Sequence, residues 1–152
     1  MRLIIPLVLV IVLLGSLPGD ARSHCEIPCG IYDDPMRLDM IAEHIGTIEK
    51  SMHQITELSG ADPVNYNQLI RWIDNKEQHA NLLQDIAFQY FMNQRVKPVA
   101  PGGEGYDAYV EQITLLHRML VTAMKCKQTT DQAHIEELRT LLQSFRSAYL
   151  HE

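Results

Sequence analysis

Apolar residues spaced by three and four positions recur in four separate segments of this 152-residue chain. The first segment carries Leu38, Ile41, Ile45, Ile48, Met52 and Ile55. This spacing places the apolar side chains along one face of an α-helix. Asp34 before Pro35 is typical of a helix start with Asp34 as the N-cap. Gly60 is typical of the end of a helix.

The other three segments repeat this spacing. The second carries Tyr66, Leu69, Ile73, Ala80, Leu83, Ala87 and Tyr90, with Ile70 and Phe91 beside them. The third carries Tyr109, Ile113, Leu116, Leu120 and Ala123, and the fourth carries Ile135, Leu138, Leu142, Phe145 and Tyr149. Residues 97–105, rich in Pro and Gly, form a linker between the second and the third. No segment alternates with period two, so the sequence predicts an all-α, antiparallel four-helix bundle of one domain.

A leader precedes the helices. Leu3 to Leu14 is apolar throughout and follows a positively charged start, but it is shorter than the about 20 residues that a membrane-spanning helix needs. The small residues Ala21 and Ser23 complete the pattern of a secretory signal peptide. We predict that residues 1–23 are removed and that residues 24–152 form the mature domain. An uncleaved membrane anchor is the alternative.

This leader predicts export to the periplasm, the extracellular space or an organelle lumen, with signal peptidase as the processing partner. A dedicated maturation protease would leave the same N-terminus. The leader would then be a propeptide, and the protein would stay cytoplasmic.

The charge balance excludes several partners. The chain has 13 Lys and Arg against 19 Asp and Glu, a net charge of −6, and no run of basic residues. Cleavage after Ser23 makes the chain slightly more acidic. We therefore expect no nucleic-acid partner and no stable membrane association after cleavage.

The segment between the leader and the first helix contains two of the three cysteines. It reads His24-Cys25-Glu26-Ile27-Pro28-Cys29-Gly30-Ile31-Tyr32. Once His24 is the N-terminus, it offers an α-amine and an imidazole, Cys25 offers an amide nitrogen and a thiolate, and Cys29 offers a second thiolate. The amine, the amide and the two thiolates can form a planar N2S2 set that suits Ni(II) or Cu(II), with the imidazole in an axial position. In the uncleaved chain this donor set does not exist.

Two other interpretations of the segment stay open. In an oxidising compartment Cys25 and Cys29 can form a disulfide, and the protein would then be an exported helical interaction protein. Alternatively, the segment could carry copper or nickel without turnover. A histidine at the cleavage point favours metal over a disulfide.

The pattern His-Cys-x-x-Pro-Cys-Gly-x-Tyr resembles the nickel hook of nickel-containing superoxide dismutases. Its fixed positions are all present, as His24, Cys25, Pro28, Cys29, Gly30 and Tyr32. The resemblance implies a four-helix bundle assembled as a homohexamer, with one nickel ion per subunit. It also implies disproportionation of superoxide to dioxygen and hydrogen peroxide by nickel cycling between Ni(II) and Ni(III). Electron-rich thiolate and amide donors stabilise the higher oxidation state.

The resemblance also assigns roles to single residues. It makes His24, Cys25 and Cys29 the nickel ligands and Tyr32 the tyrosine that orders water and small anions near the metal. Pro28 and Gly30 shape the hook, and Pro28 matches a proline that the family holds in the cis form. Tyr32 packed under the turn is the plainer alternative.

Positions on the second helix also match residues near the family's site. Tyr90 resembles a second tyrosine there, although its place in the apolar stripe explains it equally well. The family places an arginine behind the axial imidazole at the position of His79. Its partner glutamate falls on Met40 or Ile41, so Asp39, Glu43 or His79 is expected to replace this pair.

The remaining candidates have simpler explanations. Cys126 stands alone near the end of the third helix and is interpreted as a structural thiol. A di-iron bundle needs Glu-x-x-His, a zinc protease needs His-Glu-x-x-His, and an α/β-hydrolase needs Gly-x-Ser-x-Gly. None of these patterns occurs in the sequence.

Overall fold

The computed structural model describes residues 32–150. Its helices are α2 (Asp34–Ser59), α3 (Tyr66–Asp85), the π-helix η1 (Ile86–Arg95), α4 (Tyr106–Gln128) and α5 (Ala133–Leu150). Because η1 continues α3 directly, the described chain forms four rods, and it contains no strand. The predicted all-α four-helix bundle is confirmed.

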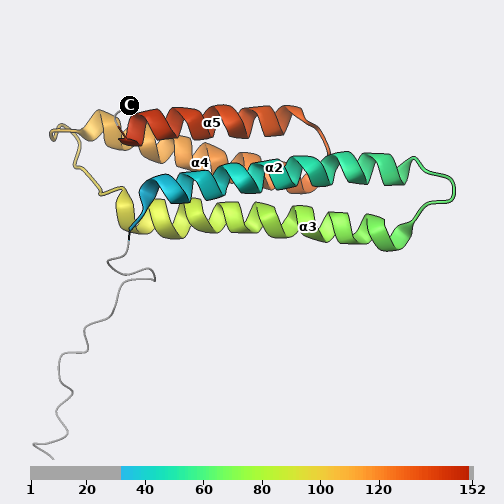
Figure 1. The fold of residues 1–152 in the computed structure, drawn as a ribbon. Coiled ribbons are helices and arrows are strands. Elements are labelled where there is room, and N and C mark those ends of the chain that lie inside the picture. Colours follow the sequence, from blue (N-terminus) through green and yellow to red (C-terminus); the bar gives the residue numbers. More distant parts are fainter. Residues whose placement is uncertain (1–31, 151–152) are drawn as a thin grey trace, which may run out of the picture.

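The rods run up and down in sequence order (Figure 1). α2 packs mainly against α3 and α4 mainly against α5, and the two pairs meet through α2 with α5 and α3 with α4. Residue 32 and the end of α5 lie at the same end of the bundle, on the left in Figure 1, together with η1 and the linker before α4. The segment that follows the predicted hook therefore enters the fold at the end of the bundle where α2 and α4 begin and η1 and α5 end.

The predicted apolar stripes form most of the core. Their fully buried members include Leu38, Ile41, Ile48, Leu83, Phe91, Leu116, Ile135, Leu138 and Phe145. The prediction that the apolar face of α3 is buried is wrong at the start of the helix, because Tyr66, Ile70 and Ile73 are more than one-third exposed. This part of α3 lies near the α2–α3 turn, at the end of the bundle opposite to residue 32.

The ends of the helices follow local capping chemistry. Asp33, not Asp34, is the N-cap of α2, because its Oδ1 accepts a hydrogen bond from the backbone N–H of Met36 at 3.0 Å. Gly60 caps the C-terminal end as predicted. At Gly105 the backbone has a φ of 80°, a left-handed conformation that favours glycine, and α4 begins at the next residue.

Two further features of the described residues bear on function. Cys126 is fully buried as a free thiol, and burial raises its pKa to about 11, which agrees with a structural role. Within residues 32–150, no helix combines the length and apolar character that crossing a membrane requires.

Candidate functional site

The predicted nickel ligands lie outside the described residues. This applies to His24, Cys25 and Cys29, and to Pro28 and Gly30 of the hook. Tyr32 is the first described residue and lies two positions before Asp34, where α2 begins. The structure therefore shows the surface from which the hook segment extends.

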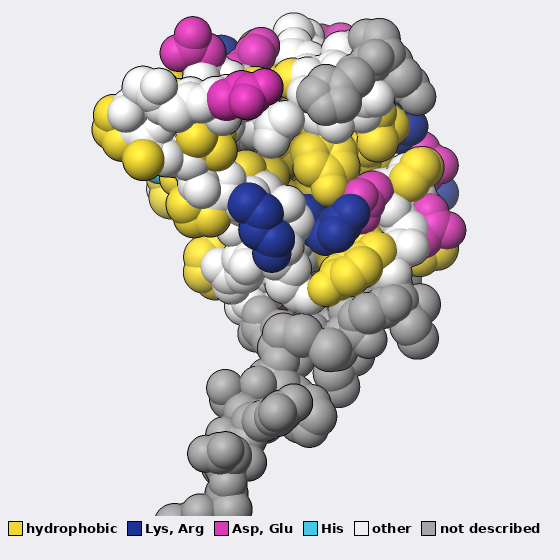
Figure 2. Space-filling view, turned by 90° about the vertical axis from the view of Figure 1, so that its left-hand side faces the viewer, with side chains coloured by type: hydrophobic (Ala, Val, Ile, Leu, Met, Phe, Trp, Pro, Cys, Tyr) yellow, Lys and Arg dark blue, Asp and Glu magenta, His cyan; other side chains and the backbone are white. Residues whose placement is uncertain are grey.

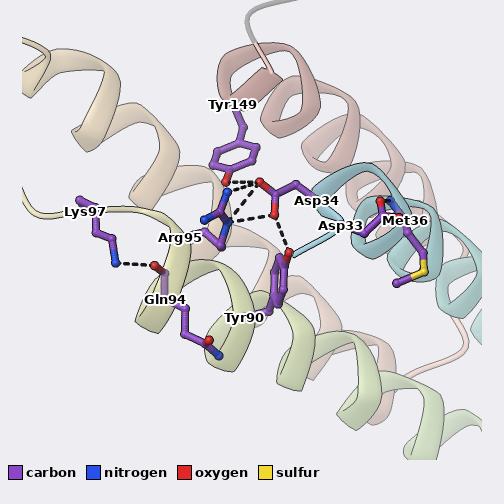
Figure 3. Close-up of polar contacts among 8 residues, drawn as sticks. All are labelled: Asp33, Asp34, Met36, Tyr90, Gln94, Arg95, Lys97 and Tyr149. Atoms are coloured by element: carbon purple, nitrogen blue, oxygen red, sulfur yellow. Dashed lines mark hydrogen bonds and ion pairs between the residues drawn. The ribbon is translucent and has the colours of Figure 1, made fainter. Parts of the chain in front are cut away.

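Asp34 is the centre of this surface (Figure 3). Arg95 donates to it from Nε, at 2.9 Å to Oδ1, and from a terminal nitrogen, at 2.6 Å to Oδ2. Tyr90 donates its hydroxyl to Oδ1 at 2.5 Å, and Tyr149 donates its hydroxyl to Oδ2 at 2.8 Å. One carboxylate at the start of α2 thus joins η1 and α5. We call Asp34, Tyr90, Arg95 and Tyr149 the Asp34 cluster.

The π-helix explains how Tyr90 and Arg95 reach the same carboxylate. They are five residues apart, which in an α-helix of 3.6 residues per turn separates two side chains by about 140° around the axis. A π-helix closes hydrogen bonds between residues five apart, as Val96 N–H does with the carbonyl of Phe91 at 2.8 Å. Residues 90 and 95 therefore share a face of η1.

The charges of the Asp34 cluster are fixed by its contacts. Burial raises the pKa of Asp34, but the hydrogen bonds from Arg95, Tyr90 and Tyr149 outweigh it, so the net pKa is lowered. Burial and the bond to Asp34 raise the pKa of Tyr90 and of Tyr149 to about 12. The hydrogen bond to Asp34 is also the main cause of the raised pKa of Arg95. At neutral pH the cluster holds one carboxylate, one guanidinium and two neutral phenols.

Tyr32 is held against this cluster by its ring. The guanidinium carbon of Arg95 lies 4.3 Å from the ring centroid, a cation–π arrangement. The rings of Tyr32 and Tyr90 also meet edge to face, with their centroids 6.0 Å apart. The side chain is nevertheless 41% exposed. The last residue of the hook pattern is therefore positioned by the bundle while part of it stays open to solvent.

Further basic groups lie beside the cluster. The guanidinium carbon of Arg37 lies 5.0 Å from the ring centroid of Tyr90. Lys97 donates from Nζ to the carbonyl of Gln94 at 2.6 Å (Figure 3). In Figure 2, which views this end of the bundle, basic side chains lie among hydrophobic ones near the middle of the face. This end carries positive groups although the whole chain is acidic.

His79 does not belong to the Asp34 cluster. It faces His44 of α2, and the two Nδ1 atoms lie 3.0 Å apart. His44 is ten residues along α2 from Asp34, which corresponds to about 15 Å. Burial, and then the neighbouring His79, lower the pKa of His44, although Glu43 acts in the opposite direction.

The other expected substitutes face solvent. Asp39 has a side chain that is 70% exposed and pairs with Arg146 at 2.5 Å. Glu43 is also exposed, one residue before His44. Neither one contributes to the Asp34 cluster in the described part of the chain.

Sequence reasoning missed Arg95 and the central role of Asp34. It treated Asp34 as a helix cap and Tyr149 as a core residue, and it assigned no role to Arg95. The sequence signal for this pairing was the five-residue spacing of Tyr90 and Arg95, just before the Pro/Gly linker. That signal has meaning only once a π-helix is known.

We expect the two phenols of the cluster to ionise late in an alkaline titration. The pKa of about 12 in the folded chain lies above 10.0, the ordinary pKa of a tyrosine. The stabilisation from each phenol is therefore complete below pH 10 and is lost as the pH rises through about 12. Tyrosinate absorbance should show a late step that Tyr90→Phe and Tyr149→Phe each reduce. A late step unchanged in both cluster variants would contradict the assignment.

Comparison with known proteins covers both the hook segment and the bundle. The model of the nickel-containing superoxide dismutase family matches residues 19–152. No curated protein and no solved structure matches the chain. The match includes residues 19–23 of the predicted leader, the complete hook pattern and all four rods. The chain belongs to the nickel-containing superoxide dismutase family.

Proposed function

We propose that the active protein begins at His24 and that His24, Cys25 and Cys29 hold its nickel ion. The family match establishes the activity, superoxide dismutation with a nickel cofactor. The observation that carries the ligand assignment is that the match starts before His24 and so spans the hook and the bundle together.

The chemistry of the donor set fits nickel. An amine, an amide and two thiolates suit a planar Ni(II) site, and the ligands bind only after losing their protons. Among residues 32–150, no group of three or more His, Cys, Asp or Glu side chains is placed to hold a metal ion.

Bound nickel would supply the electron exchange by cycling between Ni(II) and Ni(III). Two superoxide anions and two protons give one dioxygen and one hydrogen peroxide. In this chain, Arg95 and Tyr90 hold the ring of Tyr32 at the base of the hook segment. We assign Tyr32 to ordering water and the small anion near the metal, because it is the partly exposed phenol of this surface.

Tyr90 and Tyr149 have a different role from Tyr32. Both donate their hydroxyl protons to Asp34, and their raised pKa of about 12 keeps those protons in place. They are therefore poor proton donors to substrate. We assign them to positioning Asp34 and Arg95, which in turn position Tyr32.

Processing and assembly complete the proposal. Residues 1–23 are a leader whose removal exposes the amine of His24, by signal peptidase with export or by a maturation protease without it. The homohexamer of the family is proposed for this chain as well. Ile70 and Phe88, 56% and 45% exposed, are apolar side chains available for contacts between subunits.

Mass spectrometry and metal analysis of the purified protein test this proposal. We expect an N-terminus at His24, one nickel ion per chain held by the hook, consumption of superoxide, and free thiols once that metal is removed. A Cys25–Cys29 disulfide without metal would contradict the ligand assignment. Copper without superoxide consumption would indicate a metal carrier.

A further inference from the structure

His44 and His79 form a pair of imidazoles outside the Asp34 cluster. They lie on neighbouring rods, α2 and α3, and their Nδ1 atoms are 3.0 Å apart. The ring centroids are 5.1 Å apart, with the planes inclined by 67°. Two ring nitrogens that face each other across a helix interface are suited to share a proton or a metal ion.

The separation of the two nitrogens fits one metal ion. Imidazole nitrogens bind zinc at about 2.0–2.1 Å, and at that bond length two nitrogens 3.0 Å apart subtend about 95° at the ion. Neighbouring ligands in square-planar and octahedral sites lie near about 90°. Rotation of the two rings would direct both lone pairs at one ion without movement of the helices.

The packing around the pair holds it in place. Ile45 and Ala80, the next residue after each histidine, are buried in the core. Further along the same interface, Asn75 donates to the hydroxyl of Ser51 at 2.9 Å. Ligands on rigid elements need little reorganisation to bind. Both imidazoles are only half-buried, so solvent can complete the coordination shell of an ion.

The charges near the pair also favour a cation. Glu43 precedes His44 and is exposed, and its charge favours the positive form of that imidazole. Lys76, the lysine closest in sequence to His79, places Nζ 3.7 Å from Glu77 Oε1 and donates to the carbonyls of Lys127 at 2.5 Å and Thr129 at 3.3 Å. Its charge is thus used at the end of α4.

We infer that His44 and His79 form a second metal site, which takes one divalent ion of the nickel, copper or zinc class through both Nδ1 atoms. Binding displaces the proton that the two nitrogens share in the metal-free protein. The site contains no thiol, so oxidation of Cys25 and Cys29 leaves it intact. It therefore differs in chemistry from the hook, and it does not depend on the hook assignment.

The test uses the mature chain with the hook silenced by His24→Gln, Cys25→Ser and Cys29→Ser. Calorimetric titration with NiCl2 should show one ion bound per chain. Adding His44→Asn or His79→Asn should weaken binding by about tenfold or more, since loss of groups that only orient ligands already costs 10–100-fold. His117→Asn, which changes an exposed histidine of α4, should have no effect.

A second measurement does not depend on substitutions. With ZnCl2, nitrogen NMR of the hook-silenced chain should show the Nδ1 signals of His44 and His79 shifting together at one equivalent. No shift, or equal nickel binding with and without both histidines, would overturn the site and leave a simple hydrogen bond between the helices. Neither result bears on nickel in the hook. That assignment is tested separately, by metal analysis of the protein without substitutions.

Discussion

One additional alanine before His24 is expected to abolish nickel binding at the hook and, with it, superoxide consumption. The extra residue converts the α-amine of His24 into a peptide amide and moves the free amine out of the donor set. Groups that only orient ligands change metal affinity by 10–100-fold when lost, so loss of a ligand should reduce activity by about 100-fold or more. Pulse radiolysis and metal analysis of the purified chain measure both effects.

The matched control carries the added alanine after Glu152 instead, and it should keep its nickel and its activity. Circular dichroism should be the same for both chains, because the described helices begin at Asp34 and do not include the hook. Full activity in a chain shown by mass spectrometry to retain the alanine before His24 would refute the proposed ligand set.

Asp34→Ala is expected to destabilise the bundle by about 3 kcal/mol, because it leaves the charge of Arg95 and two phenols without their acceptor. The side chain of Asp34 is 14% exposed and that of Arg95 is 28% exposed, so solvent compensates only in part. Urea unfolding followed by circular dichroism measures the change in the free energy of unfolding.

Asp39→Ala is the matched control on the same helix. Asp39 also pairs with an arginine, but its side chain is 70% exposed, so its loss should cost about 1 kcal/mol or less. Equal costs for the two variants would show that the Asp34 cluster does not hold the end of the bundle together.

The sequence predicts the helices well because most of their regularly spaced apolar residues are buried in the core. Spacing by three and four reports which face of a helix is buried, and Leu38, Ile48 and Phe145 are all fully buried as expected. The same spacing fails at Tyr66 and Ile73, which are exposed near the end of the bundle opposite to residue 32. Periodicity defines a face of a helix, but it does not say how far the neighbouring helices cover that face.

The candidate site is predicted only in part, for two physical reasons. The hook could be recognised because its donors are consecutive in sequence. The Asp34 cluster could not, because Asp34, Arg95 and Tyr149 come from distant positions and Arg95 reaches Asp34 through a π-helix. In an α-helix, the side chain of Arg95 would point away from that of Tyr90. The pairing of His79 with His44 likewise depends on the register of two helices.

The long connections of Asp34 have a consequence for the order of assembly. This residue bonds partners 56, 61 and 115 positions away, so formation of the Asp34 cluster closes long loops of the chain. Contacts of high sequence separation carry the largest loop-closure cost and form after local structure. In a zinc finger the metal ion drives folding. Here the bundle supplies its own core, and we expect the folded protein to come first and to receive its nickel afterwards.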